Sequence, residues 1–157
     1  MKHRWSILSN MVCNLILIGF ILFLQLIHYP LLSKIGSHIN KALFSEYFQH
    51  LSTQILVLFI LPMLVELFSS IILFWKKPHP QSASLYKLSM ICLAIIWGVL
   101  IVNQLLFQQI LSQGYHVVAH NLLTISTWAA TITWCIKGIL SLIILTQSMR
   151  QLSPQKT

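Results

Sequence analysis

The chain has 157 residues and a formal net charge of +8, but only 8% of its residues are charged while 57% are hydrophobic. Its mean hydropathy of +0.80 lies far outside the range of soluble proteins. The composition therefore excludes a soluble globular protein and predicts an integral membrane protein of a single domain.

Four apolar stretches are long enough to cross a hydrocarbon core, which takes about 20 residues of helix. We expect these helices at about residues 8–29, 54–75, 89–110 and 121–147. The sequence thus predicts an all-α fold, a four-helix bundle within the membrane.

The first helix carries a narrow polar stripe. At 100° per residue, Asn10, Asn14, Gln25 and His28 fall within about 60° of one another. An amide without a partner is costly in hydrocarbon, so this stripe must face other helices or a wet cavity. Hydrogen bonding between helices and a polar binding site both remain open. Pro30 is expected to end this helix.

The segment between the first two helices has apolar residues four apart. They are Ile35, Ile39, Leu43, Tyr47 and Leu51, and charged residues lie outside this face. This spacing predicts a short amphipathic helix on the outer membrane surface.

Two ionisable residues lie within the predicted spans. Glu66 is roughly 18 Å and Lys137 roughly 24 Å below the outer helix ends, at 1.5 Å per residue. A lysine side chain can bridge most of that difference, so the two could form an ion pair or carry protons. A purely structural salt bridge and a protonated Glu66 are the alternatives. Pro62 predicts a kink one turn above the carboxyl group.

The distribution of basic residues predicts the orientation. The segment from Trp75 to Ser82, WKKPHPQS, is expected to form a cytoplasmic turn. Seven basic residues belong to the predicted cytoplasmic segments and two to the outer loops: Lys2, Arg4, Lys76, Lys77, Lys87, Arg150 and Lys156, against Lys34 and Lys41. This bias places both termini in the cytoplasm and favours contact with anionic lipid. It does not form the single basic stripe typical of nucleic-acid binding.

Polar side chains gather at the outer ends of the helices. His28, His50 and His120 are expected at similar heights, with Gln104 and Gln108 on the third helix. Neutral imidazoles from neighbouring helices suit haem or a transition metal. Their spacing does not identify a metal, and interfacial histidines without a ligand role remain the alternative.

Several short motifs resemble a family of small bacterial four-helix membrane proteins of unknown function. They are HYP at residues 28–30, YFQH at 47–50 and PMLVE at 62–66, followed by Gln104, Asn121 and Trp128. The family is distantly similar to anthrone-oxygenase-like membrane domains. The resemblance implies a four-helix fold in a bacterial cytoplasmic membrane. The chain departs from the family pattern at Gln108, where the family has a histidine, and at Thr124, where it has an arginine.

Three functions are compatible with these observations. The first is a redox or oxygenase-type protein that acts on a lipophilic molecule and uses haem or a metal, with Glu66 and Lys137 as catalytic candidates. The second is a binding or transport protein for a small amphipathic molecule, and the third is a non-catalytic subunit or assembly factor of an oligomer or membrane complex. The candidate ligand-binding residues are Gln25, His28, Tyr29, Tyr47, His50, Gln104, Gln108, Asn121, Thr124 and Trp128, and the candidate metal ligands are His28, His50 and His120.

Overall fold

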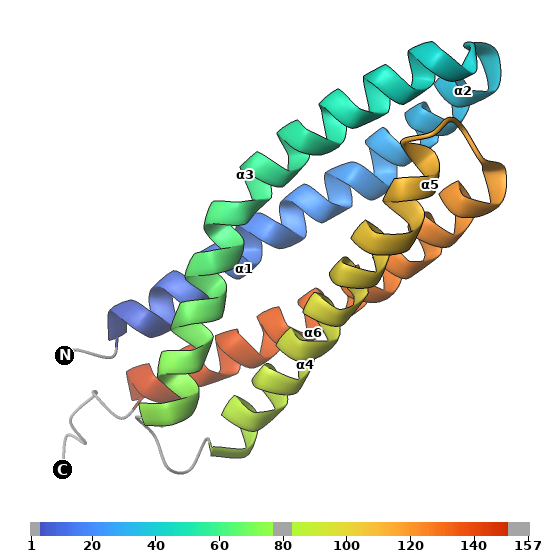
Figure 1. The fold of residues 1–157 in the computed structure, drawn as a ribbon. Helices are drawn as coiled ribbons and strands as arrows, with labels where there is room; N and C mark the ends of the chain where they lie inside the picture. Colours follow the sequence, from blue (N-terminus) through green and yellow to red (C-terminus); the bar gives the residue numbers. More distant parts are fainter. Residues whose placement is uncertain (1–3, 77–82, 151–157) are drawn as a thin grey trace, which may run out of the picture.

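The computed structural model describes residues 4–76 and 83–150, and every regular element in these ranges is helical. The elements are α1 (Arg4–Phe23), a first π-helical segment (Leu24–His28), α2 (Tyr29–His38), α3 (Lys41–Lys76), α4 (Ala83–Val102), a second π-helical segment (Asn103–Gln108), α5 (Gln109–Leu111) and α6 (Val117–Arg150). The π-helical segments join α1 to α2 and α4 to α5 without a turn. The described chain therefore folds into four long helical units (Figure 1).

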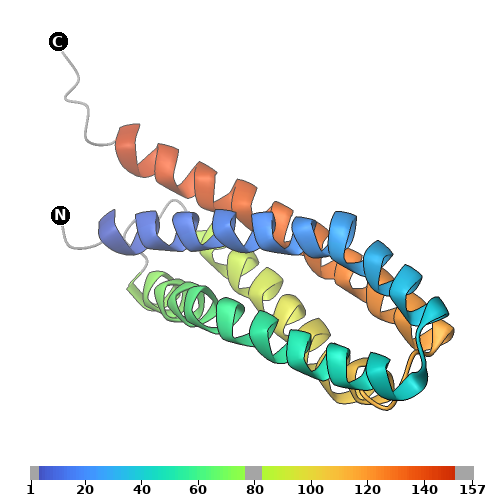
Figure 2. The ribbon, with the colours of Figure 1, turned by 90° about the horizontal axis from the view of Figure 1, so that it is seen from above.

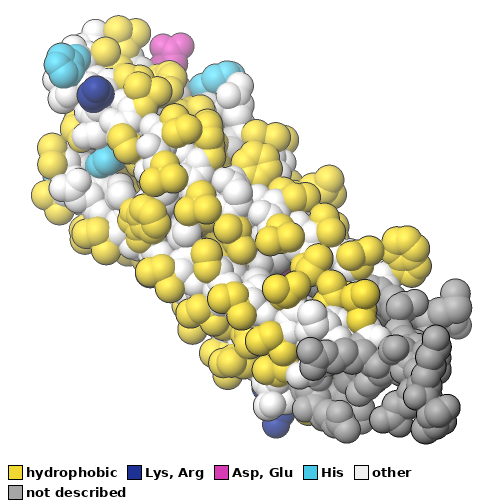
Figure 3. Space-filling view, turned by 180° about the vertical axis from the view of Figure 1, so that it is seen from behind, with side chains coloured by type: hydrophobic (Ala, Val, Ile, Leu, Met, Phe, Trp, Pro, Cys, Tyr) yellow, Lys and Arg dark blue, Asp and Glu magenta, His cyan; other side chains and the backbone are white. Residues whose placement is uncertain are grey.

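Each helical unit is long and apolar enough to cross a membrane. The four candidate spans are Trp5–His38, Lys41–Lys76, Ala83–Leu111 and Val117–Met149. Hydrophobic side chains cover the middle of the molecule, whereas charged and histidine side chains gather near its ends (Figure 3). The predicted all-α fold with four helices long and apolar enough to span a membrane is confirmed.

The two ends of the bundle differ. The beginning of α1 and the end of α6 lie together at one end, termed here the terminal end (Figures 1 and 2). The turns from α2 to α3 and from α5 to α6 lie at the other, termed the distal end. The part of the predicted cytoplasmic turn at residues 77–82 lies outside the described residues.

The bundle is held together mainly through α1 and α6. Helix α1 packs against α3 and α6, α4 packs against α6, and α3 and α4 touch each other less closely. The central core contains Leu17, Ile21, Phe59, Ile96 and Trp134, which come from all four helical units. Room for a cavity is therefore left on the side between α3 and α4.

The distal segment differs from the prediction of a separate amphipathic helix. The residues up to His38 continue the first unit, and those from Lys41 begin α3. The break occurs at Ile39, which is extended at φ −104° and ψ 159°, and the Asn40 side chain accepts a hydrogen bond from the Leu43 amide at 2.9 Å. This is an N-cap, and it starts α3 thirteen residues before the predicted position of 54.

The buried face of this segment also differs from the predicted one. Phe44 and Phe48 are buried, whereas Leu43 and Tyr47 are exposed. The ring centroids of Phe44 and Phe48 are 5.9 Å apart, and both pack in the distal core with Leu32 and Leu111. Aromatic packing against the neighbouring units, rather than a membrane surface, sets which face is buried.

Pro30 does not end the first helical unit. The Tyr29 amide donates to the carbonyl of Leu24, five residues earlier, and Pro30, which has no amide hydrogen, comes next. A π-helical turn is wider than an α-helical one, so it relieves the clash that a proline ring makes with the preceding turn. Helix α3 likewise continues through Pro62 and changes direction near its middle (Figures 1 and 2).

Candidate functional site

Glu66 and Lys137 meet inside the bundle. The Lys137 Nζ lies 2.7 Å from the Glu66 Oε1, and the two side chains are 0% and 2% exposed, respectively. Glu66 comes from α3 and Lys137 from α6, so the pair joins two helical units. The structure thus brings together the two residues that the depth estimate placed within reach of each other.

Two further side chains donate hydrogen bonds to the Glu66 carboxyl group. Asn14 Nδ2 lies 2.8 Å from Oε1, and Trp134 Nε1 lies 3.2 Å from Oε2. Together with Lys137 they supply three donors, which suits an ionised carboxylate because hydrogen bonds to the charged form stabilise it. The position of the carboxylate is therefore fixed from α1 and α6 at once.

Asn10 forms a second polar layer one turn closer to the terminal end. Its Nδ2 donates to Ser70 Oγ at 2.7 Å and to Ser69 Oγ at 2.9 Å, and its Oδ1 accepts from Ser141 Oγ at 3.1 Å. All these side chains are buried. The stripe of asparagines on α1 therefore serves, at this level, to hydrogen-bond the helices to one another.

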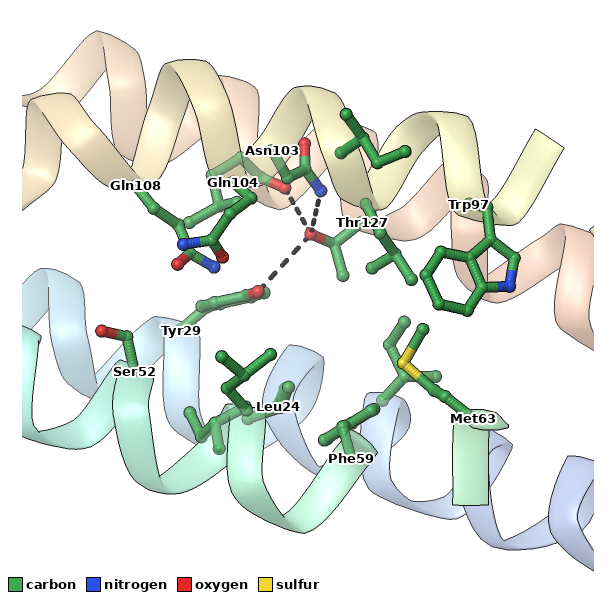
Figure 4. A pocket seen from close by; sticks show the side chains of 16 residues that line it. Leu24, Tyr29, Ser52, Phe59, Met63, Trp97, Asn103, Gln104, Gln108 and Thr127 are labelled. Atoms are coloured by element: carbon green, nitrogen blue, oxygen red, sulfur yellow. Dashed lines mark hydrogen bonds between the residues drawn. The ribbon is translucent and has the colours of Figure 1, made fainter. Parts of the chain in front are cut away.

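A cavity of about 360 Å³ occupies the distal half of the bundle. All four helical units line it, and most of its wall is apolar, with Phe59, Met63 and Trp97 at its deep end (Figure 4). Its polar lining residues are Tyr29, Ser52, Asn103, Gln104, Gln108 and Thr127. None of the residues that line it is an aspartate, glutamate, lysine, arginine, histidine or cysteine. The cavity is thus an uncharged space with a few amides and hydroxyls.

A hydrogen-bonded chain fixes one wall of the cavity. The Thr127 hydroxyl donates to the Leu123 carbonyl at 2.6 Å, so it accepts from Asn103 Nδ2 and from the Tyr29 hydroxyl, each at 3.4 Å. Asn103 Oδ1 in turn accepts from Ser126 Oγ at 2.6 Å. Tyr29 directly follows the first π-helical segment, and Asn103 is the first residue of the second. Their hydrogen bonds to Thr127 therefore tie both segments to α6 beside the cavity.

Gln104 and Gln108 project into the cavity from the α4 side, facing Tyr29 and Ser52 (Figure 4). Their side-chain amides form no hydrogen bond with any other described residue, whereas Asn103 beside them is bonded twice. Gln104 is exposed and Gln108 is half-buried. In a hydrocarbon environment an amide without a partner is costly unless a ligand or water satisfies it.

The three candidate histidines do not form a metal site. Among the residues that the structure describes, no three His, Cys, Asp or Glu side chains could hold a metal ion. His120 is buried and its Nε2 lies 3.1 Å from the Tyr29 carbonyl oxygen, while exposed His50 pairs with Gln54 at 3.0 Å. His28 is half-buried against the Tyr29 ring.

The π-helical segment explains why His28 is displaced. An α-helical wheel at 100° per residue holds as far as Leu24, and the asparagines before it are buried as expected. The wider π-helical turn adds a residue, so that Tyr29 rather than His28 reaches the inner position. The predicted stripe therefore ends at Gln25, whose Nε2 donates to the Thr124 carbonyl at 3.4 Å.

The other candidate ligand-binding residues divide into two groups. Gln104, Gln108 and Tyr29 line the cavity, whereas Tyr47, Asn121 and Trp128 are exposed outside it. The Thr124 hydroxyl donates to the His120 carbonyl within α6.

Sequence reasoning missed several polar residues of both regions. Asn103 and Ser126 were missed although Asn103 directly precedes Gln104 and Ser126 lies between Thr124 and Thr127, so each stands beside polar residues that the sequence singled out. Ser69 and Trp134 had a usable signal, since each lies three residues from Glu66 or Lys137 and therefore on the same helical face.

No protein-family profile, curated protein or solved structure matches the chain. The structure itself defines the class: an all-helical bundle with four helices able to span a membrane, a buried ion-pair network and a distal uncharged cavity.

Proposed function

We propose that this chain is a multi-pass protein of a bacterial cytoplasmic membrane that binds an uncharged lipophilic small molecule in the distal cavity. The proposal rests above all on Gln104 and Gln108, whose unpaired amides face a largely apolar space of about 360 Å³. Ligand pockets are typically about 300–1,000 Å³, largely apolar, with a few polar groups that orient the ligand. Gln104 and Tyr29, which the family resemblance singled out, both belong to this lining.

Binding without chemistry accounts for the cavity better than the oxygenase or redox hypothesis. Acid–base catalysis uses a group that can exchange a proton within hydrogen-bond reach of the substrate. Tyr29 is the only ionisable side chain that lines the cavity, and its hydroxyl bonds to Thr127. Glu66 and Lys137 do not line it and are occupied with each other.

The charge bias supports an orientation with both termini in the cytoplasm. With seven basic residues in the predicted cytoplasmic segments and two in the outer loops, the distal end faces outward. The cavity then lies in the outer half of the membrane.

The proposal is tested by closing the cavity at its rim. Leu56 of α3 and Ile101 of α4 line the cavity and are 53% and 51% exposed, so tryptophan at both positions would fill its mouth. Leu58→Trp with Ile95→Trp is a matched control, because these residues are similarly exposed on the same helices but do not line the cavity.

Small molecules that copurify with each variant are extracted and quantified by mass spectrometry. We expect the rim variant to retain at least about tenfold less of the occupant than the wild type, since overfilling a packed site commonly costs 1–3 kcal/mol. The control pair should retain as much as the wild type. Equal retention in the rim and control variants, or no copurifying molecule in the wild type, would contradict the proposal.

A further inference from the structure

The cavity is polarised along the helix axes. Its distal part has Ser52 on α3 and Gln108 opposite, and its deep part has Met63 and Trp97 (Figure 4). Ser52 and Met63 are eleven positions apart on α3, which corresponds to about 16 Å at 1.5 Å per residue. Polar groups thus lie at one end of the cavity and hydrocarbon and aromatic side chains at the other.

The polar end offers both donors and acceptors but no charge. The amides of Gln104 and Gln108 each carry an NH₂ donor and a carbonyl acceptor. The Tyr29 hydroxyl hydrogen is directed to Thr127, which leaves the phenolic oxygen able to accept from a ligand. Such a set matches a head group with a carbonyl and a hydroxyl, and no residue that lines the cavity carries a charge to balance a carboxylate or an ammonium.

The cavity also opens towards the membrane interior. Leu56, near the middle of α3, and Ile101, near the end of α4, lie at its rim and are about half exposed. Helices α3 and α4 touch each other less closely than the other neighbouring pairs. A molecule dissolved in the bilayer can therefore reach the cavity sideways between these two helices.

We infer that the occupant is an uncharged, single-chain lipid whose carbonyl- and hydroxyl-bearing head lies at Gln104 and Gln108 and whose chain extends to Trp97. This inference rests on the proposed function. A volume of about 360 Å³ is near the lower limit of ligand pockets and suits one chain rather than two. The lipid keeps the direction it has in the adjacent leaflet, with its head towards the distal end, so it enters without inverting.

The orientation is tested with two monoacylglycerol probes in nanodiscs. One carries a photoreactive diazirine at the chain terminus, and the other carries it next to the ester. The terminal probe should label the deep lining at Met63 and Trp97, and the ester probe should label the region of Gln104 and Gln108. An excess of unlabelled monoacylglycerol should suppress both, whereas the corresponding anionic fatty acid and a plain alkane should suppress them at least about tenfold less effectively.

A glutamine variant tests the head contact. Gln104→Leu with Gln108→Leu should weaken competition by monoacylglycerol about tenfold or more, which is the loss of one to two net hydrogen bonds. Gln109→Leu is the control, because Gln109 is exposed on the same helical unit and does not line the cavity. Thermal unfolding verifies that the variants are folded.

The outcomes separate the two proposals. Reversed labelling positions, equal competition by the fatty acid, or unchanged competition in the double glutamine variant would overturn the lipid assignment alone. The lipid assignment alone also fails if the competitor suppresses no labelling but the rim variant still loses its copurifying molecule. If rim-dependent retention is absent, the proposed function fails as well.

Discussion

Breaking the Glu66–Lys137 pair should destabilise the bundle strongly. Both side chains are almost completely buried, and the Nζ–Oε1 distance is 2.7 Å. Removing one partner leaves the other charge buried, which commonly costs about 3–5 kcal/mol. We therefore expect Glu66→Gln and Lys137→Met each to lower the free energy of unfolding by about this amount.

The two single substitutions should not be equivalent. In Lys137→Met, the carboxylate keeps the donors Asn14 and Trp134. In Glu66→Gln, the ammonium group retains only a neutral amide oxygen, because its one hydrogen bond is to Glu66. Glu66→Gln should consequently be the more damaging change.

The double variant measures the coupling. With both charges removed, no buried ion remains, and the loss should be smaller than the sum of the single losses by about 2 kcal/mol or more. Free energies of unfolding are compared in mixed micelles by titration with dodecyl sulfate. Lys87→Met, which removes an exposed lysine on α4, is the control and should change stability by less than about 0.5 kcal/mol. Strict additivity of the two single losses would refute the interpretation of a compensated buried pair.

Three further predictions concern packing, the cavity wall and orientation. Gly36→Ala should lower stability by about 1–3 kcal/mol in the same micelle titration, because a Cβ would lie 2.3 Å from the Tyr115 ring. Gly19→Ala, with nothing within 4 Å, should be neutral or stabilising in that assay. Asn103→Ala should cost about 1–2 kcal/mol in the micelle titration, since its two side-chain bonds to α6 are lost. A reporter that is active only in the cytoplasm should work when fused after Thr157, and activity of a periplasm-only reporter there would reverse the orientation.

The number of helices and the ion pair could be predicted because they depend on simple lengths. A hydrocarbon core requires a fixed number of apolar residues, and a rise of 1.5 Å per residue places Glu66 and Lys137 at comparable depths. Neither the number of spans nor the depth of these two residues depends on how each helix is rotated about its axis. The stripe formed by Asn10 and Asn14 was also predicted, since it lies in the regular part of α1.

The distal end could not be predicted in the same way because its helices depart from the regular period. One π-helical segment moves Tyr29 into the position expected for His28. Nothing in the sequence around Pro30 distinguishes a helix that ends there from one that widens and continues. The choice depends on contacts between units, such as the Tyr29 carbonyl with His120 and the Tyr29 hydroxyl with Thr127.

The second π-helical segment, Asn103–Gln108, has no proline to account for it and faces the first across the same cavity. π-helical turns interrupt the favoured hydrogen-bonding pattern of a helix and are frequently found at functional sites. Here the Asn103 bonds to α6 offset part of that cost, but the free amides of Gln104 and Gln108 add to it. A sequence shaped by stability alone would favour leucine at these two positions, as at neighbouring Leu105 and Leu106. The glutamines therefore support the proposal of an occupant that hydrogen-bonds to them.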